Sequence, residues 1–335
     1  MKIKRLGRTG LKVSELCLGT MTFGAQADET VSFAILDKAT EGGINFLDTA
    51  DVYPVPVTAT SVGRTEEIIG KWLKGKRDRV VLATKCRGKM GDKPWDEGLS
   101  RKHILQAVED SLRRLQTDYI DLYQTHSPDL ETPIEETLSA LDTLVRSGKV
   151  RYIGCSNYGA WRLAQALWAS DKLHLARYDC VQPRYNILFR QIEEEVLPLC
   201  REEGVGVIAY NPLAGGFLTG KYRKDADADA GTRFDVLKGK TSLYHDRYWH
   251  EAQFNAVEEL KAFFEVRAKP LAQVAVAWVL QQPEITSAII GASRPEQLDA
   301  TLAAVNTPLE AEELAACDDA WFSLPRPRDP NIALR

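Results

Sequence analysis

The chain has 335 residues, of which 44% are hydrophobic and 27% charged, and this balance excludes a disordered or fibrous protein. The net charge of −4 gives no overall attraction to nucleic acid or to an anionic membrane, so neither is expected as a partner. The six cysteines form no C-x-x-C pair, which predicts reduced thiols in a cytoplasmic protein. No apolar stretch approaches the length of a membrane span, and we expect no signal peptide.

The pattern of apolar residues predicts a barrel. Residues 3–6 and 11–13 indicate a short N-terminal β-hairpin that closes the barrel bottom. Eight short apolar runs, typical of buried parallel strands, follow at 15–19, 44–48, 80–85, 119–123, 150–154, 178–182, 205–210 and 287–290. Amphipathic helical patterns lie between and after them, at 65–73, 100–115, 133–146, 158–170, 191–203 and 295–305. This alternation predicts an α/β fold, a (β/α)8 TIM barrel.

Two segments interrupt the alternation. Residues 222–248 are polar and predict a long loop after the seventh strand, and residues 322–335 predict a C-terminal tail containing proline and arginine. Long loops in compact domains are usually functional, so we expect both segments to extend over the C-terminal face of the barrel. No linker or repeat divides the chain. Residues 1–335 are therefore predicted to form a single barrel domain, with 1–15 as its hairpin.

Polar residues stand at nearly every predicted strand end, which is where barrels place their chemistry. Asp48 ends the second strand, Tyr53 lies in the loop after it, Lys85 ends the third strand and His126 follows the fourth. A tyrosine titrates near pH ~10, and a nearby ammonium lowers that pKa. A carboxylate fixes the lysine, and a histidine can orient a carbonyl or relay a proton. Such a set could protonate a carbonyl oxygen as hydride reaches the carbon.

Each of these residues also has an ordinary structural interpretation. Asp48 alone could cap a turn, Tyr53 could be a packing aromatic and Lys85 could be a solvated charge. Only their joint placement favours catalysis. The other four histidines have no matching partners and there is no H-E-x-x-H motif, so no metal is expected.

Several segments, in order along the chain, resemble the aldo-keto reductase family. They are Ile44–Tyr53, Ala83–Lys85, Gln124–His126, Gly154–Asn157 and Ile290–Leu298, and the resemblance runs from about Leu6 to about Leu302. It implies an NAD(P)H-dependent carbonyl reductase on a (β/α)8 barrel with no metal. In such a protein Tyr53 is the acid/base catalyst, Lys85 and Asp48 tune it, and His126 orients the substrate.

The same resemblance implies a set of cofactor contacts. Ser156, Asn157 and Gln182 would hold the nicotinamide carboxamide, and Tyr210 would stack beneath the ring. The segment 212–221 would wrap the pyrophosphate, through Pro212, Leu213, Gly215, Leu218 and Lys221. The adenosine end would be held by Gly291, Ser293, Arg294 and Gln297.

Ser293 and Arg294 would face the adenosine 2′-phosphate, which favours NADPH (NADP+ when oxidised) over NADH. One departure from the family pattern is Thr301, where many relatives have asparagine near the adenine. The preference between the two cofactors is therefore less firmly implied than the catalytic set.

These observations lead to three functional hypotheses. The first is NADPH-dependent reduction of an aldehyde or ketone, a small-molecule carbonyl substrate, by a monomer or homo-oligomer. The second is an NADPH-binding partner or sensor protein, because the potassium-channel beta subunits also resemble this family. The third, a phosphosugar isomerase, needs a glutamate base that the strand ends do not offer. Loops set specificity, so Trp95, the stretch 53–57 and the tail aromatics are candidates for the substrate pocket.

Overall fold

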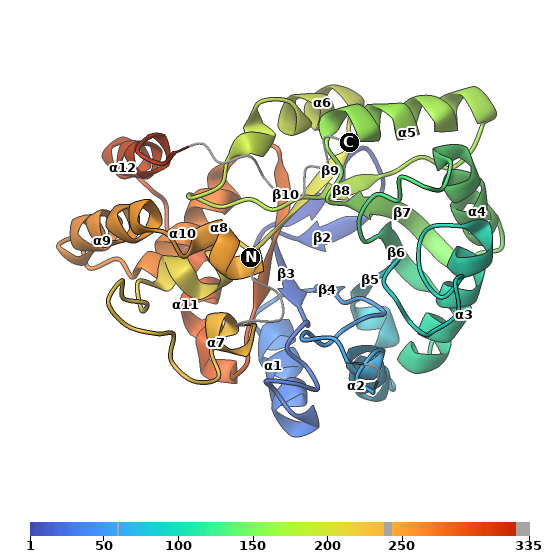
Figure 1. Cartoon of the computed structure of the whole chain (residues 1–335), viewed down its shortest axis with the longest axis horizontal. Coiled ribbons are helices and arrows are strands. Elements are labelled where there is room, and N and C mark those ends of the chain that lie inside the picture. The colour runs from blue at the N-terminus through green and yellow to red at the C-terminus, as the bar shows by residue number, and fades with distance from the viewer. Residues whose placement is uncertain (59, 238–242, 326–335) are drawn as a thin grey trace.

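Eight parallel strands close into a barrel in the computed structural model, which describes residues 1–58, 60–237 and 243–325 (Figure 1). The strands are β3 (Leu16–Gly19), β4 (Phe46–Asp48), β5 (Val81–Cys86), β6 (Ile120–Thr125), β7 (Val150–Ser156), β8 (Cys180–Gln182), β9 (Gly206–Tyr210) and β10 (Ile285–Gly291). Each neighbour is the next strand along the chain, and β10 closes the ring between β9 and β3. All eight predicted runs contain a strand, so the predicted (β/α)8 fold is confirmed.

Helices surround this barrel. They are α1 (Glu29–Glu41), α2 (Arg64–Leu73), α3 (Arg101–Leu115), α4 (Ile134–Arg146), α5 (Ala160–Leu173), α6 (Val196–Glu203), α7 (Arg233–Val236), α8 (Leu243–Tyr248), α9 (Glu251–Glu265), α10 (Leu271–Gln281), α11 (Leu298–Ala303) and α12 (Ala311–Phe322). Ser100 caps α3 by accepting a hydrogen bond from the His103 amide, and Pro133 stands directly before α4. Each of the six predicted helical patterns contains a helix. The patterns did not include α1, α9, α10 or α12.

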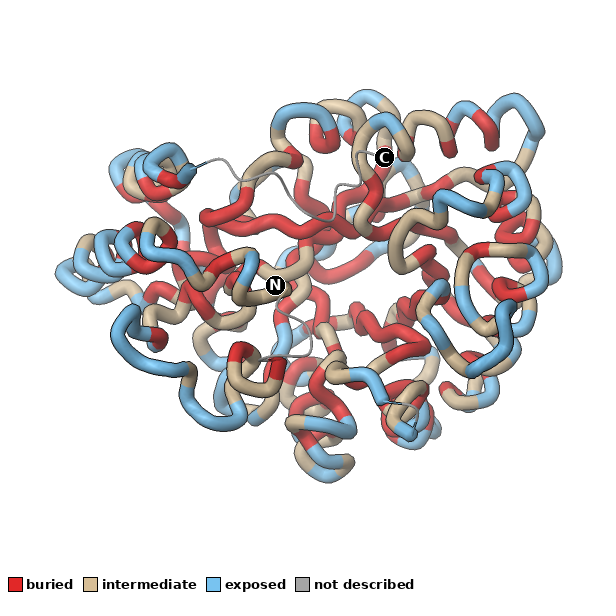
Figure 2. The backbone as a smooth tube through the Cα atoms, viewed as in Figure 1, coloured by how far each residue is buried: buried red, intermediate tan, exposed pale blue. Residues whose placement is uncertain are grey.

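The inside of the barrel is an apolar layer built from alternate strand residues. Cys17, Phe46, Ala83, Leu122, Cys180 and Ile208 form this layer, and Leu6 and Val13 pack against it. Leu6 follows β1 (Ile3–Arg5) and Val13 belongs to β2 (Lys12–Ser14), which pair antiparallel. The N-terminal hairpin therefore closes the barrel bottom, as predicted. Figure 2 shows the barrel strands as buried chain within a partly exposed shell of helices.

The polar stretch 222–248 differs from the expected loop, because its described part contains the helices α7 and α8. Phe234 of α7 is fully buried, and its ring lies 5.8 Å from that of Phe217 and 4.8 Å from that of Tyr222. These aromatic contacts are formed by the tertiary fold and do not follow a helical spacing of apolar residues within the stretch. The sequence therefore indicates these helices only weakly. Of the predicted tail, Phe322 ends α12, and residues 326–335 lie outside the described part.

All six cysteines are free and buried. Within the described residues, no helix combines the length and the apolarity needed to cross a membrane.

Candidate active site

Strand register brings the predicted catalytic residues to one end of the barrel. Asp48 lies beside Gly19 of β3 and Ala83 of β5, and Lys85 lies beside Gln124 of β6. Further round the ring, Ser156 of β7 pairs with Gln182 of β8. Because all eight strands are parallel, their carboxyl ends meet at the same mouth.

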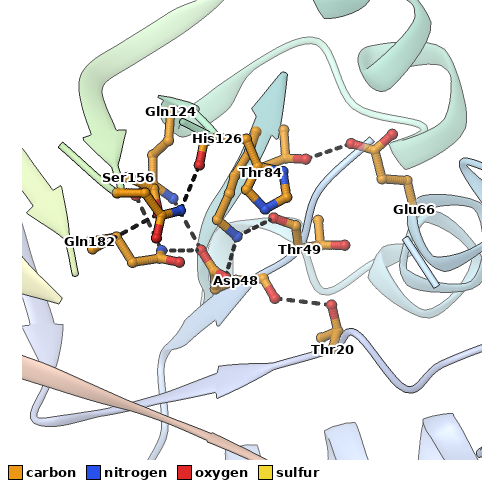
Figure 3. A network of polar contacts seen from close by, with 11 residues as sticks. Thr20, Asp48, Thr49, Glu66, Thr84, Gln124, His126, Ser156 and Gln182 are labelled. Atoms are coloured by element: carbon orange, nitrogen blue, oxygen red, sulfur yellow. Dashed lines mark hydrogen bonds and ion pairs between the residues drawn. The ribbon is translucent and has the colours of Figure 1, made fainter. Parts of the chain in front are cut away.

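Lys85 and Asp48 form a buried ion pair at this mouth. Figure 3 shows Asp48 within the surrounding network of polar contacts, together with Gln124 and Gln182. The Lys85 Nζ lies 2.5 Å from Asp48 Oδ1 and donates a second hydrogen bond, of 2.8 Å, to the Thr49 carbonyl. Burial is the largest single effect and lowers the pKa of Lys85, but the charge and hydrogen bond of Asp48, together with Tyr53 and Cys17, raise that pKa above its ordinary value. The lysine is therefore held as an ammonium inside the protein.

The second carboxylate oxygen of Asp48 is also fully engaged. Asp48 Oδ2 accepts hydrogen bonds from Gln124 Nε2 at 3.0 Å and Gln182 Nε2 at 2.9 Å. Buried charges persist where hydrogen bonds replace their hydration, and here two amides and one ammonium do so. Gln124 therefore belongs to the site because it holds the Asp48 carboxylate. The sequence indicated this only by the position of Gln124 at the end of a predicted strand.

Tyr53 lies close to this pair, but its relation to Lys85 differs from the expectation. The Lys85 Nζ lies 5.3 Å from the centroid of the Tyr53 ring, and no hydrogen bond joins the two side chains in the described structure. Burial raises the pKa of Tyr53 above its ordinary value, and the opposing effect of Lys85 is smaller. Lys85 does lower this pKa, as predicted, but desolvation of the phenolate is the larger effect, so the pKa lies above its ordinary value. The phenol stays protonated at neutral pH.

His126 packs against Tyr53, with ring centroids 5.7 Å apart and planes at 78°. Burial, with smaller contributions from Lys85 and Arg87, lowers the pKa of His126 to about 3. The imidazole is consequently neutral at physiological pH. It can orient a carbonyl oxygen by hydrogen bonding, but it carries no proton to donate as an imidazolium.

A cavity of about 1480 Å³ opens above these side chains. Asp48, Tyr53 and His126 line it, whereas Lys85 is completely buried and does not line it. Eleven of the thirteen predicted cofactor residues line the same cavity: Ser156, Asn157, Gln182, Tyr210, Pro212, Leu213, Gly215, Lys221, Gly291, Ser293 and Gln297.

Two predicted cofactor residues do not line it. The Leu218 side chain is fully buried in the core, and its amide donates to the Leu213 carbonyl. Arg294 is exposed, although its charge contributes to lowering the pKa of Lys221.

The polar groups predicted to hold a carboxamide form one hydrogen-bonded set. Asn157 Nδ2 donates to the His126 carbonyl at 2.9 Å, and Asn157 Oδ1 accepts from the Tyr210 hydroxyl at 2.8 Å. Ser156 Oγ donates to the Gln182 carbonyl at 2.8 Å. Asn157 has a φ of 61°, a left-handed conformation that asparagine tolerates better than most residues. These contacts fix the cavity wall beside His126.

The turn after β9 fits a pyrophosphate. Gly215 and Gly216 have φ values of 70° and 96°, and a Cβ on Gly215 would lie 2.6 Å from the Tyr244 ring. Desolvation lowers the pKa of the neighbouring Lys221, which Asp229 opposes and the charges of Arg294 and Arg233 reinforce. Cations gathered this closely, beside backbone able to approach a ligand, suit a strongly anionic group. The residues present therefore fit a dinucleotide with phosphates.

Several lining residues were not among the predicted site residues. Arg233, Tyr244 and Arg247 come from α7 and α8, and Arg87 and Arg162 come from the segments after β5 and β7. Thr301, which departs from the family pattern, also lines the cavity. A polar loop carries no periodic signal, so only the tertiary fold could assign the α7 and α8 residues.

The chain is similar to several known proteins over most of its length. Residues 15–321 match the model of the Aldo/keto reductase family. The chain is 43% identical over 328 residues to "Uncharacterized oxidoreductase YrpG" of Bacillus subtilis (strain 168), covering 96% of each chain. It is 38% identical to "Probable voltage-gated potassium channel subunit beta" of Arabidopsis thaliana, covering 91% of this chain and 92% of the relative.

A third relative is "L-glyceraldehyde 3-phosphate reductase" of Escherichia coli O157:H7, 34% identical over 327 residues, with 95% of this chain and 92% of the relative covered. The matched segment includes all eight barrel strands and every predicted site residue. The chain belongs to the Aldo/keto reductase family.

Proposed function

We propose that this protein reduces an aldehyde or ketone to an alcohol, using NADPH and Tyr53 as the general acid. The observation that carries the proposal is the buried Lys85–Asp48 pair beneath a protonated Tyr53 and a neutral His126, at the floor of a cavity of about 1480 Å³. Oxidoreductase relatives support the reaction class.

Each residue of the site has its own part in the proposed reaction. When bound, the nicotinamide would supply a hydride to the carbonyl carbon. His126 holds the carbonyl oxygen toward Tyr53, and the Tyr53 hydroxyl gives its proton to that oxygen as negative charge develops there. Lys85 stabilises the phenolate that remains, and Asp48 keeps Lys85 charged. Ser156, Asn157 and Gln182 would hold the carboxamide, and Lys221 and the 215–216 turn would hold the pyrophosphate.

Replacing Tyr53 by phenylalanine tests the acid. We expect Tyr53→Phe to lower kcat for carbonyl reduction by about 10²–10⁴-fold, because a positioned acid contributes roughly that much. The dissociation constant for NADPH, measured by fluorescence titration, should change little. The control is Tyr152→Phe, on β7 beside the bottom layer of the barrel and outside the cavity. Equal loss of turnover and cofactor binding in Tyr53→Phe would contradict the assignment of Tyr53 as the general acid.

The alternative is an NADPH-binding partner or sensor of the channel beta-subunit type. The relative from Arabidopsis thaliana supports it. Single-turnover oxidation of bound NADPH separates the two. A reductase should oxidise the cofactor when given a panel of aldehydes and ketones, whereas a sensor would bind NADPH tightly and leave it unoxidised across the panel.

A further inference from the structure

Two guanidinium groups line the cavity beside His126 without a carboxylate partner. Arg87 follows β5 directly, and Arg162 lies in the first turn of α5. In the part of the chain that the structure describes, neither side chain forms an ion pair. The Arg162 Nε is buried with no hydrogen-bond partner there. Arg162 is half-buried, and Arg87 is exposed at the rim of the cavity. Guanidinium groups that line a ligand cavity without a carboxylate partner are well suited to bind an anion.

The two arginines are held by consecutive carbonyls of one loop. Arg87 Nε donates to the Pro128 carbonyl at 3.2 Å, and an Arg162 Nη donates to the Asp129 carbonyl at 3.0 Å. The two guanidinium groups therefore converge on the loop that follows His126. Each keeps further N–H donors for a ligand.

The Asp129 carboxylate in that loop forms no ion pair with them within the described residues. Asp129 Oδ2 accepts from the Leu99 amide at 2.8 Å and from Thr132 Oγ1 at 2.7 Å, and Asp129 Oδ1 accepts from the Glu131 amide at 2.9 Å. Burial would raise the pKa of Asp129, but these hydrogen bonds lower it, so the carboxylate is ionised and bound to its own loop. It fixes the positions of the two carbonyls that hold the arginines.

The start of α5 adds a separate attraction for negative charge. Gly159 caps this 14-residue helix without any side-chain hydrogen bond, and it lines the cavity together with Trp161 and Arg162. First-turn amides of a helix favour an anion, and no side-chain oxygen of the cap satisfies them here. Glu97 and Glu131 also line the cavity, and like Arg87 they are exposed to solvent, where screening weakens the effect of each charge.

We propose that the carbonyl substrate carries an anionic group, a carboxylate or a phosphate, which Arg87 and Arg162 bind at the mouth of the cavity. This inference rests on the proposed function, because it assigns the substrate class of the same site. Arg87 lies within electrostatic reach of His126, so the anionic group and the carbonyl belong to one small molecule.

Matched substrate pairs test this proposal. One pair is 4-carboxybenzaldehyde and neutral 4-formylbenzamide, and the other is glyceraldehyde 3-phosphate and glyceraldehyde. We expect kcat/KM to favour an anionic member by about tenfold or more, because a hydrogen bond to a charged group discriminates at least this much. The pair with the larger ratio identifies the anion. Arg87→Met and Arg162→Met should each remove most of that ratio, mainly by raising KM for the anionic members.

Two further measurements make the result decisive. Arg201→Met, at a side chain that is 61% exposed and outside the cavity, is the control and should keep the full ratio. Calorimetric binding of 4-(hydroxymethyl)benzoate and its amide to the NADP+-loaded protein needs no turnover. Tighter binding of the carboxylate that both arginine variants lose would support the anion site even if no aldehyde were reduced, in which case only the proposed function fails. Equal ratios for both pairs, with equal binding of the two alcohols, would overturn the anion site.

Discussion

Lys85 shows how burial and charge compete at a single residue. It is completely buried, and its ammonium persists because Asp48 lies 2.5 Å away. Asp48 in turn is held by Gln124 and Gln182 from two further strands. Removing one member of such a pair leaves the other charge buried without a partner. This typically lowers the free energy of unfolding by about 3–5 kcal/mol.

The neutral state of His126 leads to a pH prediction. Its pKa is lowered to about 3, so the imidazole has already lost its proton well below pH 5. The pKa of Tyr53 is raised above its ordinary value of about 10, so the phenol stays protonated through neutrality. We therefore expect kcat for reduction, measured at saturating cofactor and substrate, to be flat between about pH 5 and about pH 8.

His126→Asn, which cannot titrate, is the matched variant. It should give a lower rate and a profile of the same flat shape. A break near pH 6.5 that is present in the natural protein and absent from this variant would show that His126 exchanges a proton during turnover.

At the scale of elements, the strands were predictable because a buried parallel strand is apolar on both faces. β5 begins and ends one residue later than the predicted run 80–85. Because neighbouring parallel strands end at the same edge, the predicted strand ends were enough to place Asp48 and Lys85 near each other. The helices α7 and α8 were not predictable, because Phe234 is buried by Phe217 and Tyr222 rather than by its own periodicity. The raised pKa of Tyr53 was also beyond the sequence, since desolvation depends on the assembled cavity.

The contact between Gly215 and Tyr244 tests how α8 and the 215–216 turn cooperate. A Cβ at Gly215 would lie 2.6 Å from the Tyr244 ring, and the φ of 70° strains any other residue. We expect Gly215→Ala to displace Tyr244 and weaken NADPH binding by about tenfold or more, because misplaced ligands of a phosphate lose charge-assisted hydrogen bonds. Fluorescence titration with NADPH measures the change.

Gly231→Ala is the matched control for that variant. Gly231 has a similar φ of 76°, but no atom lies within 4 Å of the added Cβ. Its replacement should cost roughly 1 kcal/mol of stability through backbone strain and leave cofactor binding unchanged. Equal weakening of NADPH binding in both variants would mean that binding depends on the backbone conformation of the wider segment and not on the contact between Gly215 and Tyr244.

At the scale of the molecule, the two ends of the barrel have separate tasks. The hairpin fills the bottom with Leu6 and Val13, whereas the mouth keeps a cavity of about 1480 Å³ lined by polar and charged groups. Stability is concentrated in the apolar layers, and the buried charge of Lys85 and Asp48 lies above them. A ligand that fills the mouth should therefore stabilise the whole fold, since it binds only the folded chain.

This linkage allows cofactor preference to be measured on the intact protein. A ligand at 100 times its Kd stabilises the folded state by about 2.7 kcal/mol. Unfolding entropy for 335 residues is about 0.7 kcal/mol/K, so Tm should rise by about 4 °C. We expect NADPH to give this shift, and NADH at the same concentration a clearly smaller one, because only NADPH carries the 2′-phosphate that we propose for Arg294. Arg294→Met should bring the two shifts together. Equal shifts in the natural protein would contradict the 2′-phosphate assignment, and no shift with either cofactor would contradict the dinucleotide site itself.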